Sequence, residues 1–368
     1  MTGPRYTPLV DGLPATVPFV GPEVQERAQG HPFRARIGAN ENVFGPSPKA
    51  IEAMRTADAD IWMYADPTNF DLRNALATHN NIPTENIVVG EGIDGLLGYL
   101  VRMIVGARDG VVTSHGAYPT FNFHVAGFGG VLHTVPYNGD HEDPDALCAK
   151  AHKVDAKLVY ISNPDNPMGT WHEGPVIAAM LDKLPEGCLL VLDEAYIEFA
   201  KPSAVAQIDV DDPRVIRMRT FSKAYGMAGA RCGYAIGAAE LITAFNKIRN
   251  HFGMNRSAQY AALAALHDQD WLDATVAKVH VARTKINEIA KANGLITLPS
   301  ATNFVAMECG GDGDFARKVL TTLIADGIFV RMPFVAPQDR CIRVGCGTDA
   351  DIDAFGQALP RALAKARG

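Results

Sequence analysis

The sequence has no paired cysteine motif, no long apolar run and no basic tract. Its six cysteines form no C-x-x-C pair and no zinc-ligand spacing, so we expect buried free thiols in a reducing compartment. No apolar run reaches the roughly 20 residues that span a bilayer. The first thirty residues lack a basic stretch followed by an apolar one, so no signal peptide is predicted. These absences predict a soluble, cytoplasmic protein.

The charge balance argues against nucleic acid as a partner. The formal net charge is −7, and the basic residues are not clustered. The net charge does not exclude small anionic ligands, because their binding depends only on the local charge. Hydrophobic residues make up 47% of the 368 positions, which is enough for a sizeable core.

Short apolar runs alternate with helical segments over the first two thirds of the chain. Helices are expected from Pro48, over 71–79 and over 93–104. The alternation predicts an α/β fold whose large domain has a mainly parallel sheet flanked by helices. We predict its strands at 86–89, 110–113, 131–135, 158–162, 189–192, 215–219 and 233–236.

The pattern changes after residue 236. Long helices are expected at 239–252, 256–268 and 271–293. A smaller α+β unit follows, with strands at 303–307, 328–331 and 341–344, a helix at 314–326 and a last helix that a Thr348 capping box opens. We therefore expect an extended N-terminal arm (1–36), a large domain (37–250) and a smaller C-terminal domain that packs with the arm (251–368).

Gly90-Glu-Gly-Ile-Asp-Gly95 fits G-x-G-x-x-G between a strand and a helix. A dinucleotide site would need an acid about 20 residues later, at the end of the next strand. That strand ends in Thr113-Ser114-His115, and Asp109 precedes it. We therefore favour a phosphate at a helix N-terminus, with a ligand-free glycine turn as the alternative.

A single lysine, Lys223, lies between two apolar segments, 215–218 and 232–236. Burying an unpaired ammonium is costly, so burial lowers its pKa and yields the free amine that Schiff-base chemistry needs. Thr220, Ser222 and Arg231 provide donors for a phosphate nearby. The alternative is a solvated lysine on a surface loop.

Three further residues follow predicted strands, where α/β sheets bind ligands. Tyr118 could stack on a ligand ring or pack in the core. Asn166 lies in a turn, 163–169, of a common type. Asp193 needs a cationic or N–H partner, unless it caps a helix or forms a structural ion pair. With Lys223 and the phosphate donors, these residues fit pyridoxal 5′-phosphate (PLP).

Three motifs carry a family resemblance. They are Asn-Pro-Asp-Asn-Pro-Met-Gly (163–169), Asp-Glu-Ala-Tyr-Ile-Glu-Phe (193–199) and Arg-Thr-Phe-Ser-Lys-Ala-Tyr-Gly-Met-Ala-Gly-Ala-Arg (219–231). They resemble fold-type I, class I/II aminotransferases, and most closely the histidinol-phosphate aminotransferase subfamily. The segments 40–48 and 343–348 match too, so the resemblance covers nearly the whole chain. It is specific for the cofactor and less so for the substrate.

The resemblance implies roles for the residues around the cofactor. Lys223 would bind the PLP aldehyde and act as general base and acid, and Asp193 would keep the pyridine nitrogen protonated. Asn166 and Tyr196 would hydrogen-bond the phenolic oxygen, and Tyr118 would stack on the ring. The phosphate would contact Thr220, Ser222, Arg231 and the backbone of Gly92, Ile93 and Asp94.

The resemblance also implies a homodimer with shared active sites, which Tyr64 would enter from the neighbouring subunit. Arg343 would bind the anionic group of the substrate, and Arg331 would be a second anion contact. Met168 stands where the family commonly has threonine, and Phe19 stands where many subfamily members have a tyrosine. A phenyl ring cannot donate to a phosphate, so histidinol phosphate and an aromatic or other α-amino acid are both candidate donors.

The predicted function is amino transfer from such a donor to a 2-oxo acid such as 2-oxoglutarate, without a metal. Two alternatives use the same motifs. One is a PLP-dependent decarboxylase or lyase, because the motifs fix the cofactor and not the bond that breaks. The other is a non-catalytic PLP-binding regulatory module, which the acidic charge and the lack of a DNA-binding extension disfavour.

Overall fold

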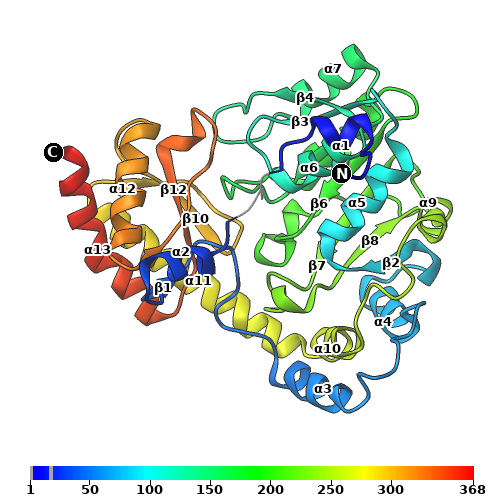
Figure 1. Cartoon of the computed structure of the whole chain (residues 1–368), viewed down its shortest axis with the longest axis horizontal. Coiled ribbons are helices and arrows are strands. Elements are labelled where there is room, and N and C mark those ends of the chain that lie inside the picture. The colour runs from blue at the N-terminus through cyan, green and yellow to red at the C-terminus, as the bar shows by residue number, and fades with distance from the viewer. Residues whose placement is uncertain (1–2, 16–19) are drawn as a thin grey trace.

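The computed structural model describes residues 3–15 and 20–368, and Figure 1 shows a sheet-bearing domain beside a smaller C-terminal unit. The central sheet has seven strands in the order β2-β8-β7-β6-β5-β3-β4. Strands β7, β6, β5, β3 and β4 are parallel, whereas β8 runs antiparallel to both β7 and β2. The bounds are β2 (Ile87–Gly90), β3 (Gly110–Ser114), β4 (Val131–Val135), β5 (Leu158–Ser162), β6 (Leu189–Asp193), β7 (Val215–Thr220) and β8 (Gly233–Gly237).

Both faces of this sheet are buried, which explains why its central strands are apolar at consecutive positions. On β5, Tyr160 belongs to the core on one face, while Val159 and Ile161 belong to the core on the other. Helices α5 (Gly92–Ile104) and α6 (Pro119–Gly127) pack on the first face, and α7 (Pro144–Val154) and α8 (Gly174–Ala178) on the second. The predicted α/β class and mainly parallel sheet are confirmed.

Several further helices surround the sheet. They are α3 (Pro48–Asp58), α4 (Phe70–Asn80), α9 (Ala239–Ala244) and α10 (Arg256–Leu266), and α10 packs against α3 and α4. The long helix α11 (Gln269–Ala292) continues from there into the C-terminal unit (Figure 1). The predicted boundary near residue 250 stays a prediction.

The C-terminal unit is built on an antiparallel sheet of order β12-β10-β9. Its strands are β9 (Ile296–Thr297), β10 (Phe304–Glu308) and β12 (Cys341–Gly345), and its helices are α12 (Gly313–Ala325) and α13 (Asp349–Arg367). Thr348 and Asp351 form the predicted capping box at the start of α13. The arm joins this unit, because β1 (Ala35–Arg36) pairs in parallel with β11 (Ile328–Phe329).

Three predicted elements differ from the structure. The helix over 239–252 is shorter: α9 gives way to a 3₁₀ turn at Phe245–Lys247, after which Arg249 donates from Nη2 to the carbonyl of Pro67. The arm is not wholly extended, because it contains α1 (Pro8–Gly12) and α2 (Pro22–Gln29), each with proline in its first turn. The strand over 328–331 ends at Phe329, and Arg331 makes only an isolated bridge.

The parallel strands place their carboxyl ends at one edge of the sheet. Ser162, the last residue of β5, is in register with Asp193, the last residue of β6, and Asp193 is in register with Met218 of β7. The loops that leave this edge therefore start side by side. No helix among residues 3–15 and 20–368 is long and apolar enough to cross a membrane.

Candidate active site

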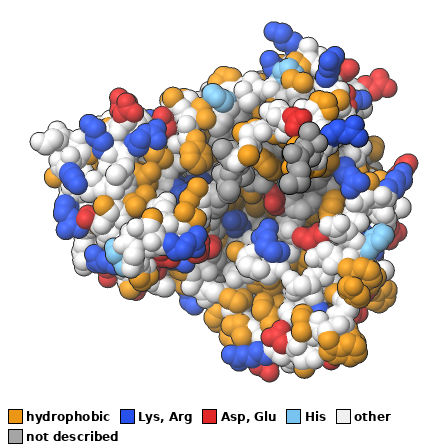
Figure 2. Space-filling view, viewed as in Figure 1, with side chains coloured by type: hydrophobic (Ala, Val, Ile, Leu, Met, Phe, Trp, Pro, Cys, Tyr) orange, Lys and Arg blue, Asp and Glu red, His pale blue; other side chains and the backbone are white. Residues whose placement is uncertain are grey.

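A cavity of about 180 Å³ opens at this edge of the sheet, against the C-terminal unit. A single buried water needs roughly 10–15 Å³ on the same measure, so the cavity has room for a small molecule. Figure 2 shows the hollow between the two bodies, with Lys and Arg side chains inside it. Its lining residues are Ala39, Asn40, Ile93, Asp94, Tyr118, Ser162, Asn166, Asp193, Ala195, Tyr196, Thr220, Ser222, Lys223, Ala228, Arg231 and Arg343.

Lys223 lies in the turn between β7 and β8 and lines the cavity. Burial lowers the pKa of its ammonium to about 8, and the nearby Arg343 acts in the same direction, while Asp193 opposes both. Its Nζ donates to the carbonyl of Asn40 at 3.3 Å and lies 5.5 Å from the centre of the Tyr196 ring. A substantial share of the lysine is therefore a neutral amine near pH 8, which is the nucleophilic form.

Asp193 ends β6 and is 5% exposed as a residue. Its Oδ1 accepts from the backbone N–H of Ala195 at 2.9 Å, and its Oδ2 accepts from the hydroxyl of Tyr160 at 2.6 Å. Burial raises the pKa of this carboxyl, whereas the two donors and the charge of Lys223 lower it. The arrangement can hold a cationic N–H group against a carboxylate.

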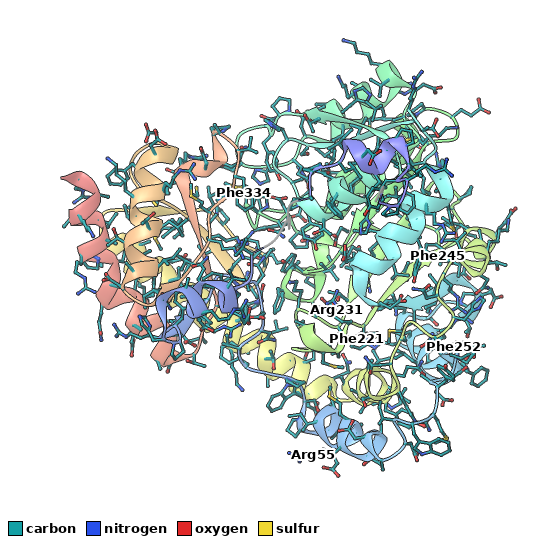
Figure 3. The ribbon with its side chains drawn as sticks, in the orientation of Figure 1. Arg55, Phe221, Arg231, Phe245, Phe252 and Phe334 are labelled. Atoms are coloured by element: carbon teal, nitrogen blue, oxygen red, sulfur yellow. The ribbon has the colours of Figure 1, made fainter. Side chains whose placement is uncertain are left out.

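One side of the cavity is formed by α5 and the turn after β7. Helix α5 begins at Gly92, whose φ of +77° suits glycine, and the side chain of its N-cap residue, Glu91, makes no capping hydrogen bond. A Cβ on Gly92 would lie 2.6 Å from Nη2 of Arg231, so glycine permits that guanidinium to approach. Figure 3 labels Arg231 on the side of the sheet that faces the C-terminal unit. A phosphate suits this combination of a helix N-terminus, a guanidinium and two hydroxyls, Thr220 and Ser222.

Arg343 enters the cavity from β12 of the C-terminal unit. Its Nη1 donates to Oδ1 of Asn166 at 2.6 Å, and burial lowers the pKa of its guanidinium to about 10. Its Nε is buried and, within the described part of the chain, has no hydrogen-bond partner. Arg343 is also paired with Arg331 through the backbone. The N–H of Arg343 donates to the carbonyl of Arg331, with an N–O distance of 2.6 Å. Arg331 itself donates from Nη2 to the carbonyl of Val20.

Eleven of the residues predicted from the sequence meet in this cavity. Of the other four, three described residues do not line it. Gly92 directly precedes Ile93, which lines the cavity, and Arg331 forms a backbone bridge with the lining residue Arg343. Tyr64 is 80% exposed on the surface, and its ring centre is 4.7 Å from that of Phe252. Phe19 lies outside the described residues.

Other residues that line or support the cavity were not predicted from the sequence. Asn40 adopts a φ of +58°, and its Nδ2 donates to the hydroxyl of Tyr196 at 2.9 Å. The segment 40–48 around it was noted in the sequence. Its contact with Tyr196, 156 residues later, leaves no sequence signal. Ser162 and Tyr160 on β5 were assigned only to a strand. The alternation of that strand could have indicated which of its side chains face the same way as Asp193.

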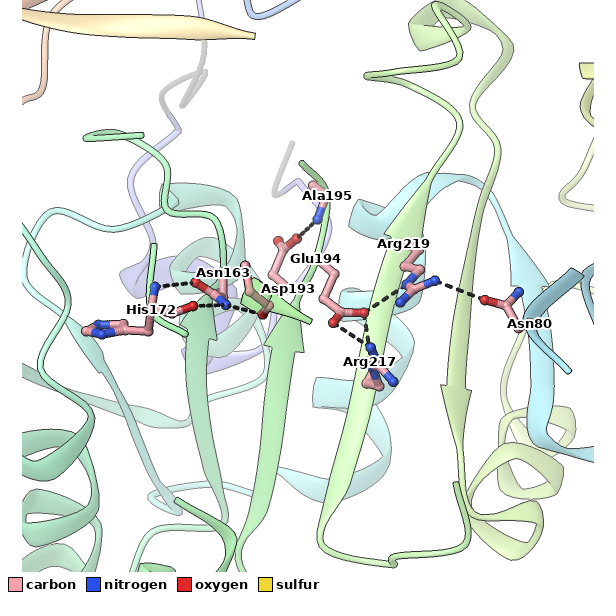
Figure 4. A network of polar contacts seen from close by, with 9 residues as sticks. Asn80, Asn163, His172, Asp193, Glu194, Ala195, Arg217 and Arg219 are labelled. Atoms are coloured by element: carbon pink, nitrogen blue, oxygen red, sulfur yellow. Dashed lines mark hydrogen bonds and ion pairs between the residues drawn. The ribbon is translucent and has the colours of Figure 1, made fainter. Parts of the chain in front are cut away.

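Figure 4 shows a buried charge network that begins at the residue after Asp193. Glu194, whose side chain is 2% exposed, pairs with Arg217 and Arg219 at 2.8 Å each. Arg219 also donates to Oδ1 of Asn80 on α4 at 2.9 Å. The two arginines hold the pKa of Glu194 below its usual value against the effect of burial. This network ties β6, β7 and α4 together next to Asp193.

The sequence matches the family model for aminotransferase class I and II over residues 36–359. A histidinol-phosphate aminotransferase from an Anaeromyxobacter species is 35% identical over 364 residues, which cover 98% of this chain and 99% of that relative. One from Desulfotalea psychrophila is 31% identical over 345 residues, which cover 92% and 90% respectively.

Solved structures agree with these sequence matches. The crystal structure of histidinol-phosphate aminotransferase from Sinorhizobium meliloti in complex with pyridoxal-5′-phosphate is 52% identical, with a TM-score of 0.96 over 99% of this chain and 98% of that one. An aspartate aminotransferase from Thermus thermophilus, solved with maleate, has a TM-score of 0.80 over 98% and 100%. At 22% identity, the latter is similar in fold alone.

Proposed function

The chain belongs to the class I and II aminotransferase family, and on that premise we propose that its amino donor is histidinol phosphate. The protein is a PLP-dependent aminotransferase. The relatives described above are aminotransferases, and none is a decarboxylase or a lyase. The proposal concerns the donor and the roles of individual residues.

The cavity fits PLP in three respects. The uncapped start of α5, together with Arg231, Thr220 and Ser222, suits its phosphate. Asp193 suits a pyridine nitrogen that carries a proton. Lys223 suits an aldehyde, because burial favours its neutral amine. We assign the phosphate to these donors and to the backbone of Gly92, Ile93 and Asp94.

When bound, PLP supplies an aldehyde that condenses with amines and a protonated ring that withdraws electrons from the substrate carbon. We assign Lys223 the roles of covalent anchor and proton carrier, with its Nζ taking the proton from Cα of the donor. Asn40 orients this amine through its backbone carbonyl. Tyr118 forms the aromatic wall over the ring, and its pKa is raised to about 12 by burial, so it stays neutral.

Asn166 and Tyr196 are assigned to the phenolic oxygen of the cofactor. Their positions support this, because both line the cavity with Asp193, Asn166 in the loop after β5 and Tyr196 in the loop after β6. Asn40 donates to the hydroxyl of Tyr196 and so leaves the hydrogen of that hydroxyl for another acceptor.

The observation that carries the donor assignment is the pairing of two arginines at the C-terminal wall. Arg343 has a buried Nε without a partner among the described residues, and Arg331 is bridged to it through the backbone. Two guanidiniums suit a phosphate, which carries more charge and more acceptor oxygens than a carboxylate. The names of the relatives at 35% and 52% identity support the same donor.

We further propose a cytoplasmic homodimer in which Tyr64 reaches the partner's cavity. Tyr64 lies in an exposed apolar group with Ile61, Trp62, Phe70 and Phe252, which are 54–80% exposed. Figure 3 labels Phe252 on the right-hand side of the sheet-bearing domain. An apolar group of this kind is typical of a surface that another protein covers.

The test is a comparison of amino donors with 2-oxoglutarate as acceptor. We expect the highest kcat/KM with histidinol phosphate, and release of the keto product without CO₂. Phe19→Tyr should raise kcat/KM for histidinol phosphate by a few-fold, because a hydroxyl can donate to its phosphate and a phenyl ring cannot. Efficient turnover of phenylalanine or tyrosine with none of histidinol phosphate would refute the donor and leave the aminotransferase assignment intact.

A further inference from the structure

Tyr160 is a buried tyrosine that does not line the cavity yet contacts its central carboxylate. It lies on β5 with no measurable exposure, in register with Val191 of the neighbouring strand β6, two residues before Asp193. Its hydroxyl donates to Oδ2 of Asp193 at 2.6 Å, within the range of charge-assisted O–H···O⁻ bonds. Neither the sequence motifs nor the family resemblance assign it a role.

The surroundings of Tyr160 fix the direction of this bond. Its ring stacks on that of Phe121 with centroids 4.5 Å apart and planes 17° apart. Ser162 donates from Oγ to the tyrosine oxygen at 3.3 Å. With that oxygen accepting from Ser162 and the ring held in place, the phenolic hydrogen points to Asp193.

The two oxygens of Asp193 are thereby held by two different donors. Oδ1 accepts from the N–H of Ala195 at 2.9 Å and Oδ2 accepts from Tyr160. Both bonds favour the ionised carboxylate over the acid, whereas burial favours the acid. The carboxylate is consequently fixed in orientation from the side of the sheet, and its remaining lone pairs are available to the cavity.

We propose that Tyr160 is a positioning residue that keeps Asp193 ionised and correctly oriented for the ring nitrogen of PLP. This inference rests on the assignment of Asp193 to that nitrogen. The proton shared by the two groups stays on the ring only while the carboxylate is the weaker base. Without the tyrosine hydroxyl, Asp193 becomes more basic and draws the proton from the ring, which then withdraws electrons less strongly.

The other ionisable groups near Asp193 do not replace this donor. Lys223 favours the carboxylate through its charge, and Glu194 opposes it but is neutralised by its two arginine partners. Tyr118 and Tyr196 lie close enough to feel the charge of Asp193, and the pKa of each is raised by burial. All these groups are unchanged by Tyr160→Phe, which removes the hydroxyl and keeps the stacked ring.

The first experiment uses the protein without PLP and measures the melting temperature against pH. Burial raises the folded-state pKa of Asp193, so its contribution to stability is greatest at low pH and is lost as the pH rises through that pKa. Tyr160→Phe should raise the pKa further. Its loss of melting temperature relative to the wild type should therefore be larger near pH 8 than near pH 5.

Asp193→Asn and a second tyrosine make this measurement specific. In combination with Asp193→Asn, the pH dependence of the Tyr160→Phe effect should disappear, because the titrating partner is gone. Tyr137 is the matched control, since it donates to a different buried carboxyl, Asp165, at 2.9 Å. The effect of Tyr137→Phe should be the same with and without Asp193→Asn. A Tyr160→Phe effect that is uniform in pH, or that survives Asp193→Asn, would overturn the proposal.

The second experiment uses the PLP-loaded enzyme. Tyr160→Phe should lower kcat by roughly ten- to a hundred-fold with little change in KM, as expected for loss of one hydrogen bond to a charged group. An unchanged kcat would overturn the positioning role. The two experiments distinguish the role of Tyr160 from the role of Asp193. If Tyr160 and Asp193 show pH-dependent coupling without PLP but turnover does not depend on Asp193, the assignment of Asp193 to the ring nitrogen is refuted instead.

Discussion

Arg343 on β12 and Asn166 after β5 lie 177 residues apart in the sequence and are joined by a hydrogen bond of 2.6 Å from Nη1 to Oδ1. Both residues line the cavity, so this bond joins a wall residue of the C-terminal unit to one of the sheet-bearing domain. It orients Arg343 with Nε still unpartnered within the described residues. The same arginine therefore links the C-terminal unit to the sheet-bearing domain and lines the cavity with a donor that has no partner among the described residues.

We predict that Arg343→Lys lowers kcat/KM for the amino donor by about ten- to a hundred-fold. Lysine keeps the charge but loses the planar fork that can bind Asn166 and an anion together. Steady-state kinetics measures the change. Arg361 is the matched control, because its pair with Asp326 is on the surface and its own side chain is 63% exposed. Arg361→Lys should leave kcat/KM unchanged, and equal effects of the two substitutions would contradict the role of Arg343.

Lys223 should make the stability of the PLP-free protein depend on pH. Its folded-state pKa is lowered to about 8 from the usual 10.5, so the unfolded chain binds the proton more tightly between these values. The contribution of Lys223 to stability should consequently rise as the pH increases from about 8 to 10.5, and it should be level below about 8, where both states bind the proton. Thermal unfolding of Lys223→Ala should lack this rise. If the difference in melting temperature between the wild type and Lys223→Ala stays constant over that pH range, the lowered pKa of Lys223 is contradicted.

Glu194→Gln should destabilise the protein by about 3–5 kcal/mol, the cost of leaving buried charges without their partner. Glutamine keeps the shape but leaves Arg217 and Arg219 without a carboxylate. Urea unfolding measures the free energy. Asp326→Asn, which breaks the exposed pair with Arg361, is the control and should cost less than about 1 kcal/mol. Similar losses for both substitutions would show that the Glu194 network contributes no more than a surface pair.

The strand ends that form the site could be predicted because their sequence signals are local. Asp193 and Lys223 each follow a buried apolar run, and parallel strands bring such residues to one edge. Tyr160 could not be singled out in the same way. A tyrosine within a buried strand is typical of a hydrophobic core. Only the pairing of β5 with β6 brings its hydroxyl to Asp193.

Elements whose limits depend on distant contacts were also missed. The helix at 239–252 was predicted too long, because the interactions that end it involve Tyr99 and Pro67, far away in the sequence. Arg331 was predicted as a second anion contact, and that role stays a prediction. Its backbone bridges to Arg343, but its contact with the carbonyl of Val20 depends on how the arm folds back. Such long-range contacts leave no periodic pattern in the sequence.

The shared active site that we propose predicts complementation between two inactive variants. Tyr64→Ala and Lys223→Ala should each be inactive or nearly so as pure dimers. A mixed dimer has one cavity with both residues intact, so mixing should restore part of the activity. Phe128 is 38% exposed and lies outside the group around Tyr64. The matched control is therefore Phe128→Ala, which should be active alone. A fully active monomer would contradict the shared site.

The most direct test of the account is to identify the lysine that binds PLP. The PLP-loaded protein should be yellow, and reduction with borohydride should link the cofactor irreversibly to its lysine. We predict that peptide mass spectrometry finds the adduct on Lys223, in the peptide that spans β7 and the turn after it. An adduct on a different lysine, or no chromophore after addition of PLP, would contradict the central claim.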